Sequence, residues 1–180
     1  MNSGDSIFLL EQRGYASRNL IGSGSVLRNM KLNIGDEAPD FELPTTAGGT
    51  FRLADNLNRG NLVLYFYPKD FTTGCTAEAC GFRDAFADLR KSEMRVLGIS
   101  TDSIETHMKF KEKYDLPFDL LSDSNGDVSG LYGAYNRLFK IANRVTFIID
   151  GDGKIVSMTK NLFSPKTHIS AATSYSTQAG

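Results

Sequence analysis

The 180-residue sequence contains only two cysteines and two histidines. Two cysteines exclude a small disulfide-stapled scaffold, and a chain of this length can bury a core without such links. A structural zinc site takes four ligands, but His107 and His168 lie in separate segments without ligand spacing. We therefore expect a chemical role for the cysteines, no zinc site, and a position for His107 on the surface of a helix.

The sequence also lacks excess charge and long apolar runs. A net charge of -1 leaves no basic excess to neutralise phosphates, so no nucleic-acid partner is expected. No apolar run approaches the about 20 residues that span a bilayer, and the longest, at 63–67 and 145–149, have the length of strands. These features predict an ordinary soluble domain without a membrane partner.

The two ends of the sequence differ from its middle. Residues 1–29 carry no sustained apolar period and are predicted to form a disordered extension, followed by one domain over 30–167. Residues 168–180 are rich in Ser, Thr and Ala without a continuous apolar stripe, which predicts an irregular tail rather than a docked helix. The arginines of the extension favour organellar targeting, but its acidic residues oppose it, so the cytoplasm is the expected location.

The middle of the sequence predicts alternating strands and helices. A buried strand over 62–67 ends at Pro68, and a helix then follows from about Thr73. This helix has apolar residues at helical spacing, namely Ala79, Phe82, Phe86 and Leu89. A second buried strand over 96–100 makes a parallel crossover the natural connection.

The remaining elements complete a mixed α/β sheet flanked by helices. Asp102 and Glu105 have capping-box spacing ahead of a helix through His107. We expect the later elements in the order short strand, turn, short helix, strand and hairpin strand, at 119–121, 123–127, 128–132, 144–149 and 154–158.

Cys75 follows the first buried strand and falls in the first turn of the predicted helix. Unpaired backbone N–H groups and the helix dipole favour negative charge there, and the thiolate is the reactive form of cysteine. Thr72 could present its hydroxyl to the same sulfur. A free cysteine is more commonly a small buried hydrophobe, so residue type and position alone leave both interpretations open.

The spacing between Cys75 and Cys80 favours chemistry over a structural role. Residues five apart on a helix rise about 7.5 Å and point roughly 140° apart, whereas a disulfide needs Cα atoms within about 4.4–6.8 Å. Joining the two therefore requires at least one helical turn to unwind, which predicts a redox-coupled change of order. A cysteine protease would need a partnered histidine, for which His107 is a weak candidate.

A longer segment around these cysteines resembles the active-site signature of the peroxiredoxins, in the bacterioferritin-comigratory or Q-type branch. The matching residues 67–84 read YPKDFTTGCTAEACGFRD. Supporting segments follow in family order, namely GDEAPDFELP, GISTDS, LLSDSNG and RVTFIID at 35–44, 98–103, 120–126 and 144–150. The resemblance extends over about residues 31–167 and implies a thioredoxin-like fold, so the domain at 30–167 is interpreted as a peroxiredoxin domain.

Carried over position by position, the resemblance assigns six site residues. Cys75 is the peroxidatic cysteine and Cys80 the resolving cysteine. The four supporting roles are binding of the peroxide, shielding of the sulfur, the cation beside the thiolate, and a polar contact to that cation. They fall on Thr72, Pro68, Arg144 and Glu78, respectively. From residue type alone, Arg144 would be a surface cation and Glu78 a solvated helix residue.

The resemblance further implies a thioredoxin-dependent thiol peroxidase that acts on hydrogen peroxide and organic hydroperoxides. The thiolate becomes a sulfenic acid, which condenses with the second thiol to a disulfide, and an external dithiol such as thioredoxin reduces it. No metal or organic cofactor is expected, and the chain is expected to be a monomer or weak dimer.

Two departures from the family pattern qualify this prediction. Thr73 stands where this branch commonly has proline, which predicts looser helix initiation. The expected irregular tail replaces a terminal amphipathic helix and would leave one sheet face exposed. The alternative function is therefore a catalytically weak redox-sensing or binding protein of the same fold.

Overall fold

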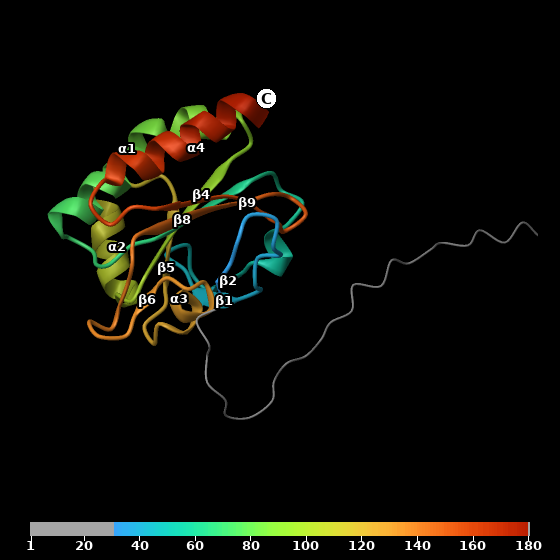
Figure 1. Ribbon diagram of the computed structural model, residues 1–180. Helices are drawn as coiled ribbons and strands as arrows, with labels where there is room; N and C mark the ends of the chain where they lie inside the picture. Colours follow the sequence, from blue (N-terminus) through green and yellow to red (C-terminus); the bar gives the residue numbers. More distant parts are fainter. Residues whose placement is uncertain (1–30, 180) are drawn as a thin grey trace, which may run out of the picture.

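The computed structural model describes residues 31–179, so the predicted extension at 1–29 lies outside the described residues. Five main strands, four helices and several short elements form the described part (Figure 1). In chain order these are β1 Glu42–Pro44, β2 Thr50–Arg52, the 3-10 helix η1 Ala54–Asn56, β3 Leu62–Phe66, α1 Thr73–Lys91, β4 Arg95–Ser100, α2 Ile104–Lys113, β5 Asp119–Ser122, α3 Asp127–Leu131, β6 Tyr135–Asn136, β7 Ile141–Ala142, β8 Val145–Ile149, β9 Ile155–Lys160 and α4 Pro165–Ala179.

A five-stranded mixed sheet in the order β5-β4-β3-β8-β9 forms the centre of the molecule. Strand β3 runs parallel to β4, and β4 runs parallel to β5, so α1 and α2 are crossover connections. Strand β8 is antiparallel to both β3 and β9. The predicted mixed α/β sheet and its parallel crossover are confirmed.

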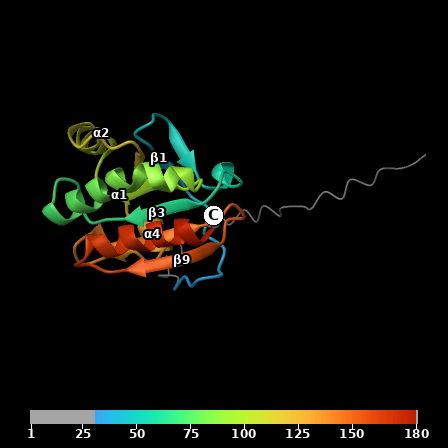
Figure 2. The same cartoon turned by 90° about the horizontal axis from the view of Figure 1, so that it is seen from above.

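Alternate side chains of β3 enter two separate cores because successive residues of a strand point to opposite faces. Val63 and Tyr65 pack with α1, α2 and α4, whereas Leu64 and Phe66 pack with the β1–β2 hairpin and α3. All five residues of β3 are buried. Figures 1 and 2 show α1 and α4 side by side across one face of the sheet.

The C-terminal segment is a helix, so the prediction of an irregular tail over 168–180 is wrong for the described residues. Helix α4 lies against α1, and its residues His168 and Ala172 are fully buried. The hydroxyl groups of three residues in α4 donate to backbone carbonyls one turn earlier, so these polar side chains have partners within the helix. The sheet face that the predicted tail would have exposed is therefore covered.

Two local predictions around α2 also need correction. The residue that caps the helix is Ser103, whose hydroxyl accepts a hydrogen bond from the Thr106 N–H, rather than Asp102 in a capping box. His107 is fully buried rather than exposed on the helix surface. It faces the loop that precedes α1, because its ring contacts Asp70 and Tyr67 in that loop.

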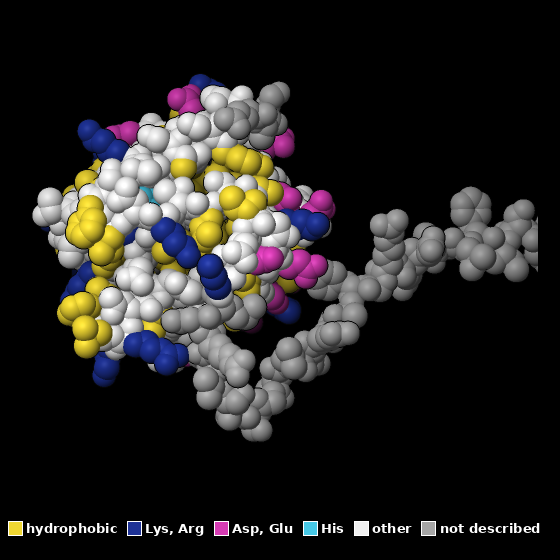
Figure 3. Space-filling model, in the orientation of Figure 1, with side chains coloured by type: hydrophobic (Ala, Val, Ile, Leu, Met, Phe, Trp, Pro, Cys, Tyr) yellow, Lys and Arg dark blue, Asp and Glu magenta, His cyan; other side chains and the backbone are white. Residues whose placement is uncertain are grey.

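The surface carries charges of both signs. On the face in Figure 3, Lys and Arg side chains are interspersed with Asp and Glu side chains, and hydrophobic side chains form several small groups. Among residues 31–179, no helix combines the length and the apolar character needed to cross a membrane.

Candidate active site

Cys75 lies at the N-terminal end of α1, where the loop after β3 enters the helix. Thr72 is the N-cap residue with extended backbone angles, and Cys75 is the third residue of the helix. The predicted helix start near Thr73 is thus confirmed. The N–H groups of a first helical turn have no intrahelical acceptor, so they direct partial positive charge toward this end. The sulfur is buried, with the residue only 2% exposed.

Arg144, the residue immediately before β8, contacts the same sulfur. Its Nη2 atom donates to Cys75 Sγ at 3.5 Å, although the two residues are 69 positions apart in the chain. A guanidinium beside a thiolate stabilises the charged form. Arg144 is buried rather than a surface cation, and a Cβ atom at Gly74 would lie only 3.2 Å from its Nη2 atom. Because Gly74 has no side chain, the guanidinium group of Arg144 has room beside the sulfur of Cys75.

Glu78 holds the other side of this guanidinium. Its Oε2 atom accepts a hydrogen bond from Arg144 Nη1, and the residue is fully buried rather than solvated. One turn of α1 separates Glu78 from Cys75, so both side chains meet the same arginine. Burial raises the pKa of the Glu78 carboxyl to about 8, and the positive charge of Arg144 opposes that shift.

The C-terminal segment completes the arrangement, and sequence reasoning missed this contribution. The backbone carbonyl of Leu162 accepts from Arg144 Nε at 3.3 Å. His168 in α4 lies fully buried beside Glu78 and contacts Thr146 Oγ1 through its Nδ1 atom at 2.8 Å. Its Nε2 atom lies 2.9 Å from the carbonyl of Asn161, an acceptor, so Nε2 carries the proton and Nδ1 accepts from the hydroxyl. Burial lowers the pKa of His168 and favours this neutral form.

A second buried network fixes the loop that delivers Cys75. Tyr67 donates to Asp70 Oδ1 at 2.7 Å, and His107 Nδ1 lies 2.7 Å from Asp70 Oδ2. The Asp70 N–H in turn donates to Asp102 in the loop before α2. These contacts anchor the loop to the sheet and to α2. No histidine spacing in the sequence pointed to them, because the partners are up to 40 positions apart.

Two further predicted residues lie on the same loop. Thr72 is exposed, and its hydroxyl donates to the carbonyl of Lys69 at 3.0 Å rather than to the sulfur of Cys75. Pro68 lies in the loop between β3 and α1, two residues after the strand ends, and is partly exposed. The structure thus places both near the entrance to the helix, while Arg144 and Glu78 make the direct contacts with or around the sulfur.

Cys80 lies in the same helix as Cys75, and both thiols are free. Both positions are helical, so about 7.5 Å of rise separates them and their side chains diverge. Cys80 is partly exposed, whereas Cys75 is buried. Within residues 31–179 no group of three or more His, Cys, Asp or Glu is placed to hold a metal ion.

Comparison with known proteins identifies the family. The family model described as "AhpC/TSA family" matches residues 34–158. A peroxiredoxin of the Bcp type from Coxiella burnetii is 47% identical over 132 residues, which cover 70% of this chain and 87% of that protein. The chain belongs to the peroxiredoxin family, in its Bcp or Q-type branch.

Solved peroxiredoxin structures share the fold. Peroxidoxin BcpB from Mycobacterium tuberculosis superposes with a TM-score of 0.75 at 37% identity, covering 81% of this chain and 96% of that chain. Peroxiredoxin Q from Xanthomonas campestris gives a TM-score of 0.70 at 26% identity, with 78% and 92% covered. The predicted thioredoxin-like fold and thiol peroxidase activity are confirmed at the level of the family.

Proposed function

We propose that Cys75 is the peroxidatic cysteine of a thioredoxin-dependent peroxidase. The observation that carries this proposal is the 3.5 Å contact between Arg144 Nη2 and Cys75 Sγ at the start of α1. The guanidinium and the free N–H groups of the first turn both stabilise a thiolate. The thiolate attacks one oxygen of the hydroperoxide, the O–O bond breaks, and the products are a sulfenic acid and, after proton uptake, water or an alcohol.

Three side chains support this step. Arg144 stabilises charge on the oxygens as the O–O bond breaks, and Glu78 holds the guanidinium in place. The Thr72 hydroxyl donates its hydrogen bond to the Lys69 carbonyl. Its oxygen lone pairs therefore remain available to accept a hydrogen bond from the peroxide O–H. Pro68, in the loop between β3 and α1, is proposed to shield the sulfur from bulk water. No step requires a metal or an organic cofactor.

Cys80 resolves the sulfenic acid. Its thiol condenses with the oxidised sulfur of Cys75, which forms one disulfide and releases one water molecule. Because both cysteines lie in α1, the first turns of this helix unwind before the sulfurs meet. An external dithiol, thioredoxin or a similar protein, then reduces the disulfide. Since both thiols belong to one chain, a monomer or weak dimer in the cytoplasm suffices for the cycle.

Organic hydroperoxides are proposed as substrates beside hydrogen peroxide. Leu162 and Phe163 follow β9 and are 51% and 91% exposed, and the backbone of Leu162 touches Arg144. They supply an apolar surface next to the reacting groups for the alkyl part of a substrate. Alkyl peroxide reduction activity is described for the bacterioferritin comigratory protein of Xanthomonas campestris, a related fold.

Single-turnover thiol counting with the two serine variants tests the assignment. Wild-type protein treated with peroxide should lose two thiols per chain without intermolecular crosslinks. Cys75→Ser should lose peroxide consumption altogether. Cys80→Ser should complete one fast turnover and then stall, and undiminished steady-state turnover would remove Cys80 from the resolving role.

The alternative function, a catalytically weak redox sensor, rested on the expected lack of a terminal helix. The structure has a terminal helix, α4, and its residue His168 lies beside Glu78. This observation supports the peroxidase over the sensor.

A further inference from the structure

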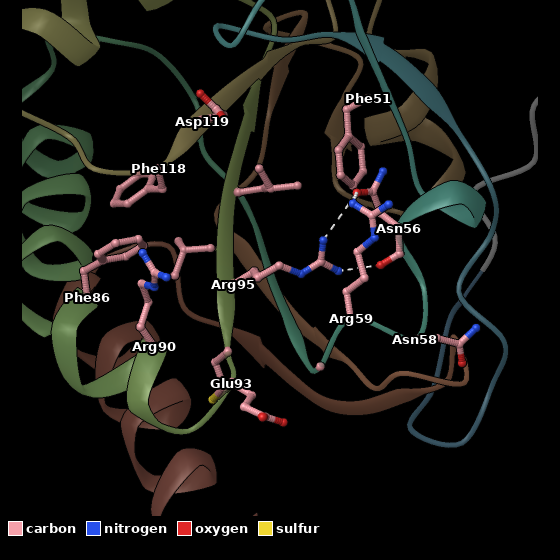
Figure 4. A pocket seen from close by; sticks show the side chains of 14 residues that line it. Phe51, Asn56, Asn58, Arg59, Phe86, Arg90, Glu93, Arg95, Phe118 and Asp119 are labelled. Atoms are coloured by element: carbon pink, nitrogen blue, oxygen red, sulfur yellow. Dashed lines mark hydrogen bonds between the residues drawn. The ribbon is translucent and has the colours of Figure 1, made fainter.

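A pocket lies at the opposite end of α1 from Cys75, where the helix ends and strand β4 begins. It encloses about 730 Å³, a volume in the range of small-molecule sites (Figure 4). Arg90 near the last turn of α1, Arg95 at the start of β4 and Arg59 before β3 all line it. Strand β5 pairs with β4 only from Leu97 onward, so the first residues of β4 border the pocket without a strand on that side.

The three arginines of this pocket have no carboxylate partner among the described residues. Arg59 Nη1 and Arg95 Nη1 share one neutral acceptor, Asn56 Oδ1, at 3.5 and 3.4 Å. Arg95 Nη2 also donates to the backbone carbonyl of Asn56 at 2.6 Å. Figure 4 shows both guanidinium groups converging on Asn56. Two like charges are thus held close together without an anion between them.

The acidic residues of the lining do not neutralise these charges. Asp119 accepts hydrogen bonds from Lys111 Nζ at 2.5 Å and from Thr46 Oγ1 at 2.9 Å. The carboxylate of Asp119 is therefore already paired with the charge of Lys111. The Glu93 side chain points away from Asn56 in Figure 4. Burial and the nearby charge of Arg59 lower the pKa of Arg95, as expected for a guanidinium without a counter-anion. The pocket therefore carries unneutralised positive charge.

Aromatic rings form the other part of the lining. Phe86 and Phe118 lie with ring centroids 6.1 Å apart, and the guanidinium carbon of Arg90 lies 5.9 Å from the Phe86 centroid. Phe51 lines the side near Asn56. Flat apolar surfaces beside guanidinium groups suit a ligand that combines an aromatic body with an anionic group.

We infer that this pocket binds an aromatic phosphate, with the phosphate at Arg59 and Arg95 and the flat body toward Phe51, which lies on the same side of β4 (Figure 4). Arginine binds phosphate through paired N–H groups, and the phosphate would separate the two like charges. Phe86 and Phe118 lie on the other side of β4 and form the wall beside Arg90 (Figure 4). This ligand site is distinct from the peroxide site, because Cys75 lies in the first turn of α1 and Arg90 near its last turn.

Isothermal titration of the full chain with phenyl phosphate tests the inference. Wild type should bind it with saturation, more tightly than inorganic phosphate, and phenol should give no measurable heat. Arg59→Gln should weaken binding about tenfold, which corresponds to about 1.4 kcal/mol, whereas Arg90→Gln, on the other side of β4 in Figure 4, should bind as wild type does. Lys91→Gln is the matched control, since Lys91 is an exposed neighbour that pairs with Asp88 outside the lining, and it should bind as wild type does.

Two results would overturn the inference. One is no saturable binding of phenyl phosphate at millimolar concentration. The other is binding that survives Arg59→Gln but is lost on alkylation of Cys75, since this would place the ligand at Arg144 instead. Circular dichroism of each variant establishes that the exposed arginine substitutions leave the fold intact.

Discussion

The Nδ1 atom of His168 in α4 lies 3.8 Å from Oε1 of Glu78 in α1, and both side chains are fully buried. Glu78 Oε1 has no hydrogen-bond partner among the described residues, whereas Oε2 holds Arg144. An unpaired buried carboxyl oxygen is costly, and the ring of His168 lies beside this one. The C-terminal helix thus contributes to the environment of the group that orients the arginine beside Cys75.

Replacing His168 with glutamine should change how stability depends on pH. Burial lowers the pKa of His168 below its ordinary value of 6.5, so the unfolded chain takes up a proton before the folded chain does. Wild-type stability is therefore lost as the pH falls below about 6.5, with a slope of at most about 1.4 kcal/mol per pH unit from this residue. His168→Gln should flatten that slope in urea unfolding measured across this pH range.

The control for this experiment is Lys166→Gln, an exposed change on the same helix that should keep the wild-type slope. Glu78 acts in the opposite sense. Its pKa is raised from 4.5 to about 8, so its contribution to stability is lost as the pH rises through about 8. Subtracting wild-type from variant stability removes that common contribution, and identical slopes for His168→Gln and wild type would contradict a neutral buried imidazole.

Gly74→Ala should slow the reaction of Cys75 with peroxide. The new Cβ atom would lie 3.2 Å from Arg144 Nη2, which forces the guanidinium away from its 3.5 Å contact with the sulfur. We expect a loss of about tenfold in the rate, equivalent to about 1.4 kcal/mol. Rapid-quench thiol counting gives the rate.

Gly130→Ala provides the comparison for this substitution. Gly130 is also helical, but a Cβ atom there would meet nothing within 4 Å. Its peroxide rate should equal that of wild type. Equal rates for wild type and Gly74→Ala would show that Arg144 does not need the space at Gly74.

Gly81 in α1 and Ile169 in α4 should behave as a coupled pair. A Cβ atom at Gly81 would lie 2.3 Å from Ile169 Cδ1, so Gly81→Ala must displace that methyl group. Overpacking costs about 1–3 kcal/mol, and the gain in helix propensity offsets about 1 kcal/mol of it. Valine lacks the Cδ1 atom of isoleucine. In urea unfolding, the double variant Gly81→Ala/Ile169→Val should therefore lose less free energy of unfolding than the two single variants lose together. Strict additivity would mean that the two helices separate more readily than their contact indicates.

Phe163→Ala should alter substrate preference rather than the chemistry itself. Phe163 is 91% exposed beside Leu162, whose carbonyl contacts Arg144. Losing the ring should raise KM for cumene hydroperoxide several-fold, because about 1 kcal/mol of apolar contact is removed, and should leave KM for hydrogen peroxide unaffected. Leu138→Ala, an exposed apolar change in the loop between β6 and β7, is the control. An equal change for both substrates would assign Phe163 a structural role.

Local patterns in the sequence predicted much of this fold. The apolar run of β3, the helical spacing of Ala79 and Phe82, and the alternation of strands with helices depend on neighbouring residues only. The same locality placed Cys75 in a first helical turn and Cys80 in the same helix. A resemblance in the sequence, rather than a local pattern, then named Arg144 and Glu78.

Helix α4 escaped prediction because its stability does not come from its own sequence. It contains many Ser, Thr and Ala residues, with no acidic residue in its first turn and no basic residue in its last turn to favour the helix dipole. Ile169 and Ala172 secure it by packing against the core beneath α1, and Gly81 lets the two helices approach closely. Packing between segments some 90 residues apart decided this element.

The sequence by itself determined the two sulfurs, the helix that carries them and the strand that leads into it, because propensity and periodicity act over a few residues. Only the tertiary structure decided that Arg144, Glu78 and His168 meet around Cys75, since Arg144 precedes β8 and His168 belongs to α4, both far from α1 in the chain. It also decided that both histidines are buried. Burial and ion pairing depend on which distant segments of the chain pack together. A local sequence pattern does not reveal these long-range contacts.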